Sequence, residues 1–123
     1  MAGSSADLHE QLERLRSETV EHHRTIVSLM EELEAIDWYD QRADACDDES
    51  LRGILVHNRD EEKEHASMLL EWLRRRDATL EQHLQTYLFS EGSITEREEE
   101  AEHQEPSDAG SLGIGSLRAE VAP

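Results

Sequence analysis

An unbroken run of helix-compatible residues limits the folds open to this chain. From Asp7 to about Ala45 the sequence contains neither Pro nor Gly. Apolar side chains recur there at three- and four-residue spacing, which places them on one face of an α-helix; they are Leu8, Leu12, Leu15, Ile26, Met30, Leu33 and Ile36. The spacing predicts one long helix over this stretch.

A second helix is expected after a short polar reversal. Residues 44–50 are polar and rich in Asp, and Asp47 or Asp48 can cap the first turn of a following helix. The apolar period resumes from about Glu49 to Arg76. Three arginines stand at the end of this segment, where cations interact favourably with a helix dipole. The pattern predicts an antiparallel helical hairpin.

The rest of the chain divides into three segments by composition. Asp77 can cap a third, shorter helix before Gly92, with an apolar face made of Leu80, Leu84, Tyr87 and Leu88. Residues 1–92 are therefore expected to form one helical domain. Residues 93–109 are acidic and then turn-forming, which predicts a disordered linker. Residues 110–118 regain spaced apolar residues among small ones and form a separate terminal peptide.

Charge excludes some classes of partner. Charged residues make up 34% of the 123 residues and aromatic residues only 4%, which is typical of long solvated helices. The net charge of -18 repels nucleic acid and anionic lipid and attracts cations. The single cysteine, Cys46, cannot form an intrachain disulfide, and no apolar run reaches the length of a membrane span. We expect a cytoplasmic protein that binds neither nucleic acid nor membrane.

Polar residues interrupt the apolar face of the second predicted helix. Following that face at three- and four-residue steps gives the series Leu55, Asn58, Glu62, His65, Leu69 and Trp72. A buried carboxylate needs a compensating partner. Glu62 and His65 lie one helical turn apart on the same face, so both can ligate one metal ion. In a chain this rich in Glu, a solvated charge run is the alternative interpretation.

Glu32 is the matching residue on the first predicted helix. In an antiparallel hairpin that turns near Asp47, residues equidistant from the turn face each other, and Glu32 and Glu62 are equidistant from it. The register therefore predicts that Glu32 lies beside Glu62 and His65. The alternative is that Glu32 is an ordinary exposed glutamate.

The number of ligands indicates a dimer. Di-iron bundles use a Glu from each of two helices and a Glu-x-x-His from each of two others, and this chain has one of each. A second copy would complete an all-α, ferritin-like four-helix bundle around two metal ions at the dimer interface. Carboxylates and imidazoles suit iron or manganese better than structural zinc, and we favour iron. Tyr39 could bond a ligand carboxylate, although a plain core tyrosine is equally consistent.

The stretch from Glu18 to Gly92 closely resembles the encapsulated ferritins of bacteria. The segments 30–40 and 57–65, Met-Glu-Glu-Leu-Glu-Ala-Ile-Asp-Trp-Tyr-Asp and His-Asn-Arg-Asp-Glu-Glu-Lys-Glu-His, carry the resemblance. It implies that Glu32, Glu62 and His65 are ferroxidase ligands with Tyr39 as their neighbour. It also implies two peripheral metal sites, for calcium or other divalent ions, made by Glu31, Glu34 and Trp38 at a metal entrance and by His57, Glu61 and Glu64.

The resemblance further implies an assembly and a partner. The family forms an annular decamer of five dimers, which oxidises iron but lacks a closed cage, so storage needs another container. The terminal peptide looks like one that docks cargo inside encapsulin shells, with Leu112, Ile114 and Leu117 as apolar anchors. The expected place of action is an encapsulin nanocompartment. Residues 119–123 follow the peptide, which departs from the family pattern.

Two other functions share most of these sequence requirements. A non-catalytic helical oligomer could bind divalent cations for assembly or buffering. A di-iron oxidoreductase of rubrerythrin type would reduce oxygen or peroxide and keep its iron bound through turnover.

Overall fold

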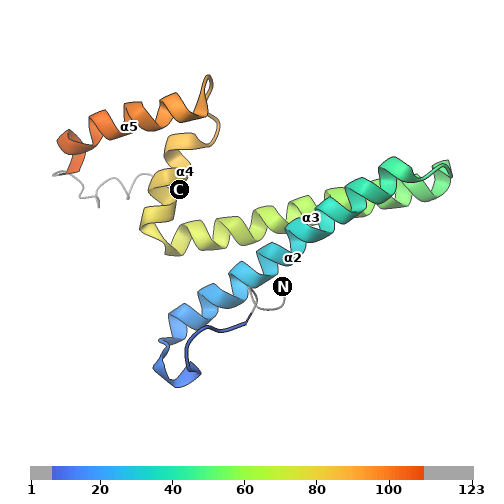
Figure 1. The fold of residues 1–123 in the computed structure, drawn as a ribbon, viewed down its shortest axis with the longest axis horizontal. Coiled ribbons are helices and arrows are strands. Elements are labelled where there is room, and N and C mark those ends of the chain that lie inside the picture. Colours follow the sequence, from blue (N-terminus) through green and yellow to red (C-terminus); the bar gives the residue numbers. More distant parts are fainter. Residues whose placement is uncertain (1–6, 110–123) are drawn as a thin grey trace. The chain divides into compact units, whose positions relative to one another are not determined.

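The chain is all-helical throughout the residues that the computed structural model describes, 7–109, and no strand occurs among them. A 3-10 turn, Leu12–Arg14, precedes four α-helices (Figure 1). These are α2 (Ser17–Ala45), α3 (Glu49–Arg76), α4 (Ala78–Tyr87) and α5 (Ile94–Ala109). None of the helices within 7–109 combines the length and hydrophobicity needed to cross a membrane. The chain separates into two compact units between Asp77 and Ala78.

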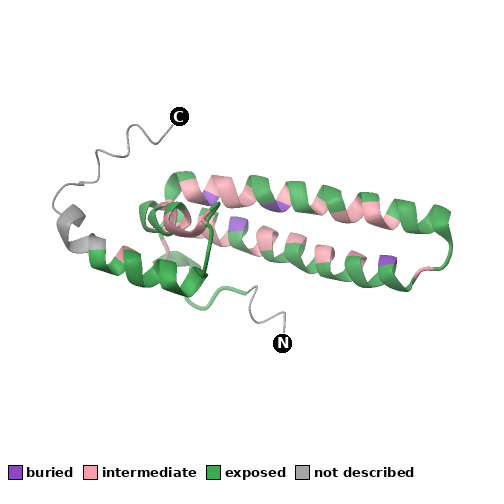
Figure 2. Ribbon diagram, turned by 90° about the horizontal axis from the view of Figure 1, so that it is seen from above, coloured by how far each residue is buried: buried purple, intermediate pink, exposed green. Residues whose placement is uncertain are grey.

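Helices α2 and α3 form the antiparallel hairpin of the first unit (Figures 1 and 2). Asp48 caps α3, because its Oδ1 accepts hydrogen bonds from the amides of Ser50 at 2.9 Å and Leu51 at 3.1 Å. Arg52 closes the reversal by donating to the Cys46 carbonyl at 2.6 Å and 3.2 Å. The predicted hairpin and the predicted bounds of its second helix are therefore confirmed.

The prediction of a first helix from Asp7 was wrong at its start. Helix α2 begins at Ser17, ten residues later in the chain. Helix α2 has 29 residues and α3 has 28, so the two arms of the hairpin match in length. A helix that began before Ser17 would extend past the end of α3 and would have no helix to pack against there. Most helical stability in proteins comes from packing against a neighbour. Leu8 and Leu12 accordingly remain 40% and 56% exposed.

The hairpin buries few side chains on its own. Only Thr25, Ala43, Ala66 and Leu73 are buried among the described residues, and most of both helices is half-buried or exposed (Figure 2). Large apolar side chains on both helices face solvent in the single chain, namely Ile26, Met30, Leu33, Trp38, Leu51, Ile54 and Met68. Two helices alone cannot cover their own apolar stripes.

The second unit pairs α4 with α5, and here the structure differs from the predicted linker. Residues 94–109, expected to be disordered, form α5. Ser93 accepts a hydrogen bond from the Glu96 amide at 3.2 Å, and Arg97 donates to the Thr86 carbonyl of α4 at 3.0 Å. The acidic segment offers little apolar surface to bury, but Glu is a good helix former once the first turn is capped. Within this unit the chain reverses through two residues with positive φ, Phe89 and Gly92.

The Asp48 cap is testable by substitution. We expect Asp48→Ala to lower the free energy of unfolding by about 1 kcal/mol, because two amides of the first turn of α3 lose their acceptor. Urea denaturation followed by circular dichroism measures the change. Asp47→Ala is the matched control, since the Asp47 side chain does not cap α3, and an equal loss in both variants would contradict the assignment.

Candidate metal centre

Three side chains from the two arms of the hairpin meet near its middle. Glu32 lies on α2, while Glu62 and His65 lie one turn apart on α3. His65 Nδ1 is 3.4 Å from Glu62 Oε1 and 3.7 Å from Glu32 Oε1. One ligand atom from each residue falls within 4.8 Å of the other two. The register predicted from equal distances to the turn is therefore confirmed, whereas the role of the three residues stays a prediction.

Glu32 is the residue of this cluster whose ionised form is destabilised by its surroundings. Its Oε1 is buried, and no donor within the described residues reaches it. The pKa of Glu32 is raised chiefly by a hydrogen bond shared with the Glu62 carboxyl, which requires a proton on one of the two groups. Burial and the charge of Glu62 raise it further, while His65 lowers it. The cluster therefore favours a bound positive charge, either a proton or a cation.

This raised pKa has a consequence for stability. Ionising Glu32 is harder in the folded chain than in the unfolded chain, so folding loses free energy as pH rises from the ordinary carboxyl pKa through the folded value. We expect Glu32→Gln to increase the free energy of unfolding of the metal-free protein at pH 7. Urea denaturation with a chelator measures this, and the gain should disappear in acid. Asp37→Asn on the exposed side of α2 should change stability little at either pH.

The donor set fits a transition metal of intermediate hardness. Carboxylate oxygens and an imidazole nitrogen suit iron or manganese, and an ion placed among them would satisfy the buried Glu32 oxygen. Glu32, Glu62 and His65 side chains are 24%, 25% and 45% exposed, so the cluster opens outward from the hairpin. Three donors leave coordination positions open for a second set of ligands or for a reactant.

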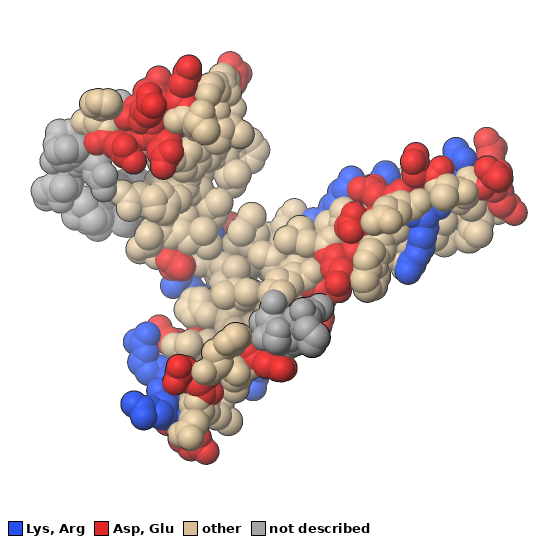
Figure 3. Space-filling view, viewed as in Figure 1, with Lys and Arg blue, Asp and Glu red and all other residues tan. Residues whose placement is uncertain are grey.

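The surrounding charge also favours cations. Acidic side chains run along both helices of the hairpin, and a separate group of them gathers on α5 (Figure 3). With a net charge of -18, the protein raises the local concentration of positive ions.

Tyr39 and Trp38 lie toward the turn from Glu32 on α2. Arg42 places its guanidinium 5.4 Å from the centre of the Tyr39 ring and 5.9 Å from that of Trp38, within cation–π range. Within the described residues the Tyr39 hydroxyl makes no hydrogen bond to the cluster. Sequence reasoning missed Arg42, although its spacing of three and four residues from these rings is a usable signal. Glu31 and Glu34 share an exposed stretch of α2 with Trp38 and do not meet a third acidic or imidazole ligand there.

The other predicted peripheral residues lie on α3. Glu61 lies between two imidazoles, with Oε2 at 3.7 Å from His57 Nε2 and Oε1 at 3.9 Å from His65 Nε2. Glu64 is exposed and does not join them. Within residues 7–109 the Glu32, Glu62 and His65 group is the one set of three that satisfies metal-ligand distances.

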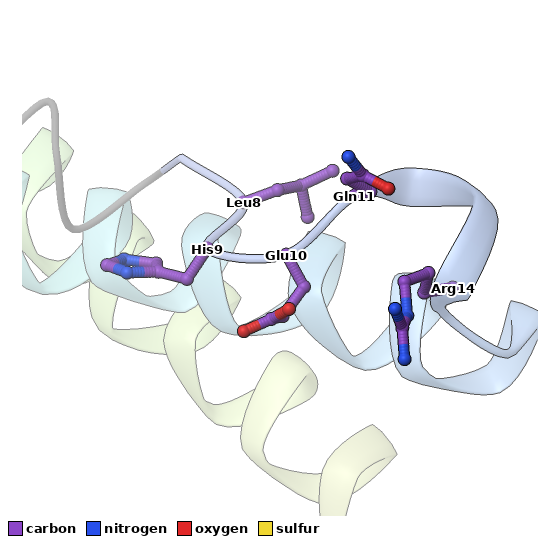
Figure 4. Close-up of a pocket in the computed structure, with 5 residues that line it drawn as sticks. All are labelled: Leu8, His9, Glu10, Gln11 and Arg14. Atoms are coloured by element: carbon purple, nitrogen blue, oxygen red, sulfur yellow. The ribbon is translucent and has the colours of Figure 1, made fainter.

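A surface pocket elsewhere in the first unit does not belong to the candidate metal centre. Figure 4 shows it lined by a single segment near the start of the described chain, with Leu8, His9, Glu10, Gln11 and Arg14. None of these residues belongs to the carboxylate–imidazole cluster. The pocket adds no ligand to the candidate centre.

A helical hairpin with a Glu on one arm against a Glu-x-x-His on the other defines a ferritin-like helical protein. Comparison with known proteins narrows this class. Residues 7–91 match the EncFtn-like family, and the chain belongs to that family of encapsulated ferritin-like proteins.

Named relatives share most of the chain. The "Encapsulated ferritin-like protein" of Rhodospirillum rubrum is 59% identical, over 99% of this chain and 95% of its own. The "Ferritin-like protein" of Thermotoga maritima is 48% identical, over 89% and 96%. A protein of Nitrosomonas europaea of known crystal structure is 54% identical and superposes with a TM-score of 0.69, over 71% of this chain and 96% of its own. The "Encapsulin nanocompartment cargo protein EncC" of Myxococcus xanthus is 34% identical, over 75% and 68%.

Proposed function

We propose that this protein is a ferroxidase, which oxidises Fe(II) to Fe(III) with dioxygen at a di-iron site shared by two copies of the chain. The observation that supports the proposal is the meeting of Glu32, Glu62 and His65 around a buried, donorless carboxylate oxygen. The family supports an iron-related role for such a cluster.

Dimerisation supplies the missing half of the site. One chain offers two carboxylates and one imidazole, and a two-fold axis beside the cluster doubles this set to four carboxylates and two imidazoles around two ions. Exposed apolar side chains on the hairpin, among them Met30, Leu33 and Met68, provide a surface that a second hairpin would cover. The resemblance to encapsulated ferritins extends this assembly to a ring of five dimers.

Iron is the substrate of the proposed reaction. Each Fe(II) gives up one electron, so two ions held together supply two electrons to one dioxygen molecule, which takes up two protons from water and leaves as hydrogen peroxide. The carboxylates hold the ions and balance the added charge as each becomes Fe(III), and Tyr39 is the proposed neighbour of this centre. Ferric product then leaves for storage.

Two peripheral groups of residues are proposed to bind cations outside this centre. Glu31, Glu34 and Trp38 form the proposed metal entrance, and their exposure on α2 is consistent with ions arriving from solvent. His57, Glu61 and Glu64 form the proposed second set, for calcium or another divalent ion.

Storage is proposed to take place inside an encapsulin shell. The names of two relatives refer to an encapsulated protein and to an encapsulin cargo protein. The proposed docking anchors, Leu112, Ile114 and Leu117, lie outside the described residues. Copurification of the full chain with and without residues 110–118 alongside a coexpressed encapsulin shell tests this part.

Oxygen consumption tests the reaction. The protein is loaded anaerobically with Fe(II), oxygen is added, and oxygen use is followed with an electrode while Fe(III) is followed by absorbance. A ferroxidase consumes oxygen in proportion to iron over repeated additions. Iron that binds without oxidation would indicate the metal-binding oligomer instead, and iron that stays bound while peroxide is consumed would indicate a rubrerythrin-type enzyme.

A further inference from the structure

Glu61 occupies a position that the proposed reaction does not use. It lies one turn before His65 and one turn after His57 on α3, so the three side chains follow one face of the helix. Its two oxygens divide between the two imidazoles, with Oε1 at 3.9 Å from His65 Nε2 and Oε2 at 3.7 Å from His57 Nε2. At 48% exposure, the Glu61 side chain has room to move closer to either ring.

The two nitrogens of His65 face different partners. Nδ1 lies 3.4 Å from Glu62 and 3.7 Å from Glu32, inside the candidate centre, whereas Nε2 faces Glu61 outside it. A neutral imidazole carries its proton on only one nitrogen, and only the other nitrogen can ligate a metal ion. An Nδ1 ligand therefore requires the proton on Nε2.

We propose that Glu61 is a positioning residue, which accepts the Nε2 proton of His65 in a hydrogen bond and thereby keeps Nδ1 available for the metal ion. This inference rests on the proposed ferroxidase centre and adds a function for a residue that does not itself touch the ions there. Metal-ligating histidines commonly donate their second N–H to a carboxylate, which fixes the tautomer and the ring orientation. The hydrogen bond requires the present separation of 3.9 Å to shorten to about 3 Å, and the half-exposed side chains of both residues leave room for that movement.

The effect on the central ions distinguishes this positioning role of Glu61 from the role of a ligand in a peripheral metal site. If Glu61 served only as a ligand beside His57, removing either residue would affect the same peripheral ion and leave the central ions unchanged. If Glu61 orients His65, its loss affects the central ions, while the loss of His57 removes only a contact with the far oxygen of Glu61.

Two measurements on the full chain test the inference. Anaerobic calorimetric titration with Fe(II) gives the affinity of the centre, and long-range nitrogen–proton NMR of the metal-free protein gives the His65 tautomer. We expect Glu61→Ala to weaken Fe(II) binding roughly 10-fold or more and to move the His65 proton away from Nε2. Glu61→Gln should restore most of both, because its amide oxygen still accepts the N–H. Asp60→Ala removes an exposed acid next to Glu61 that pairs with Arg59 and Lys63, and it should match the wild type at the centre.

The outcomes separate this inference from the proposed function. If the wild type binds and oxidises Fe(II) but Glu61→Ala leaves the tautomer and affinity unchanged, Glu61 does not position His65 and the inference is wrong. Weaker binding in Glu61→Ala with an unchanged tautomer also overturns it. If the wild type itself neither binds nor oxidises Fe(II), the ferroxidase proposal fails first.

Discussion

Replacing Glu62 with alanine is expected to reduce iron-dependent oxygen consumption by at least roughly 100-fold, to the rate of iron in buffer. Losing a residue that only hydrogen-bonds to a metal ligand already lowers metal affinity or activity roughly 10–100-fold. Glu62 is a proposed direct ligand that would serve both ions of a dimer. Its Oε1 lies 3.4 Å from His65 Nδ1, so the substitution removes one of the three donors that meet at the centre. Oxygen-electrode traces after anaerobic iron loading measure the loss.

The control for this variant has to remove the same charge from the same helix. Asp60→Ala removes an exposed acid two positions away on α3 and outside the cluster, so it should leave the central reaction close to wild type. Circular dichroism should show both variants equally helical. Oxygen consumption by Glu62→Ala at the wild-type rate would place the reaction elsewhere in the protein.

Local signals in the sequence were sufficient for the hairpin and the register of its centre. Asp48 and the three arginines ending at Arg76 fixed both ends of α3, because capping and the helix dipole act within single turns. Equal spacing from the turn then placed Glu32 opposite Glu62, since antiparallel helices of similar length advance by the same rise per residue.

Features that depend on neighbours could not be predicted in this way. The start of α2 at Ser17 follows from where α3 ends, which the apolar period of residues 8–15 does not reveal. Helix α5 depends on a Ser93 cap and on Arg97 reaching α4, and the acidic composition concealed both. The direction of each His65 nitrogen is a rotamer property, so spacing could suggest the ligand but not its orientation.

Metal removal is expected to dissociate the protein. If each ion binds the complete site of a dimer and not the separate chains, an ion present at 100 times its dissociation constant stabilises the dimer by about 2.7 kcal/mol. That corresponds to a roughly 100-fold tighter dimer for each ion, because ligation and association share one free energy. Sedimentation of the chain with anaerobic Fe(II) and with chelator measures the difference.

His65→Ala should abolish this dependence on metal while leaving the metal-free hairpin intact. The side chain is 45% exposed, so its removal opens no cavity in the single chain, yet it takes away one imidazole at each of the two ions. His83→Ala, an exposed histidine on α4, should keep the full metal response. An equally strong dimer with chelator would mean that the exposed apolar faces alone hold the chains together and that the carboxylates meet without needing iron.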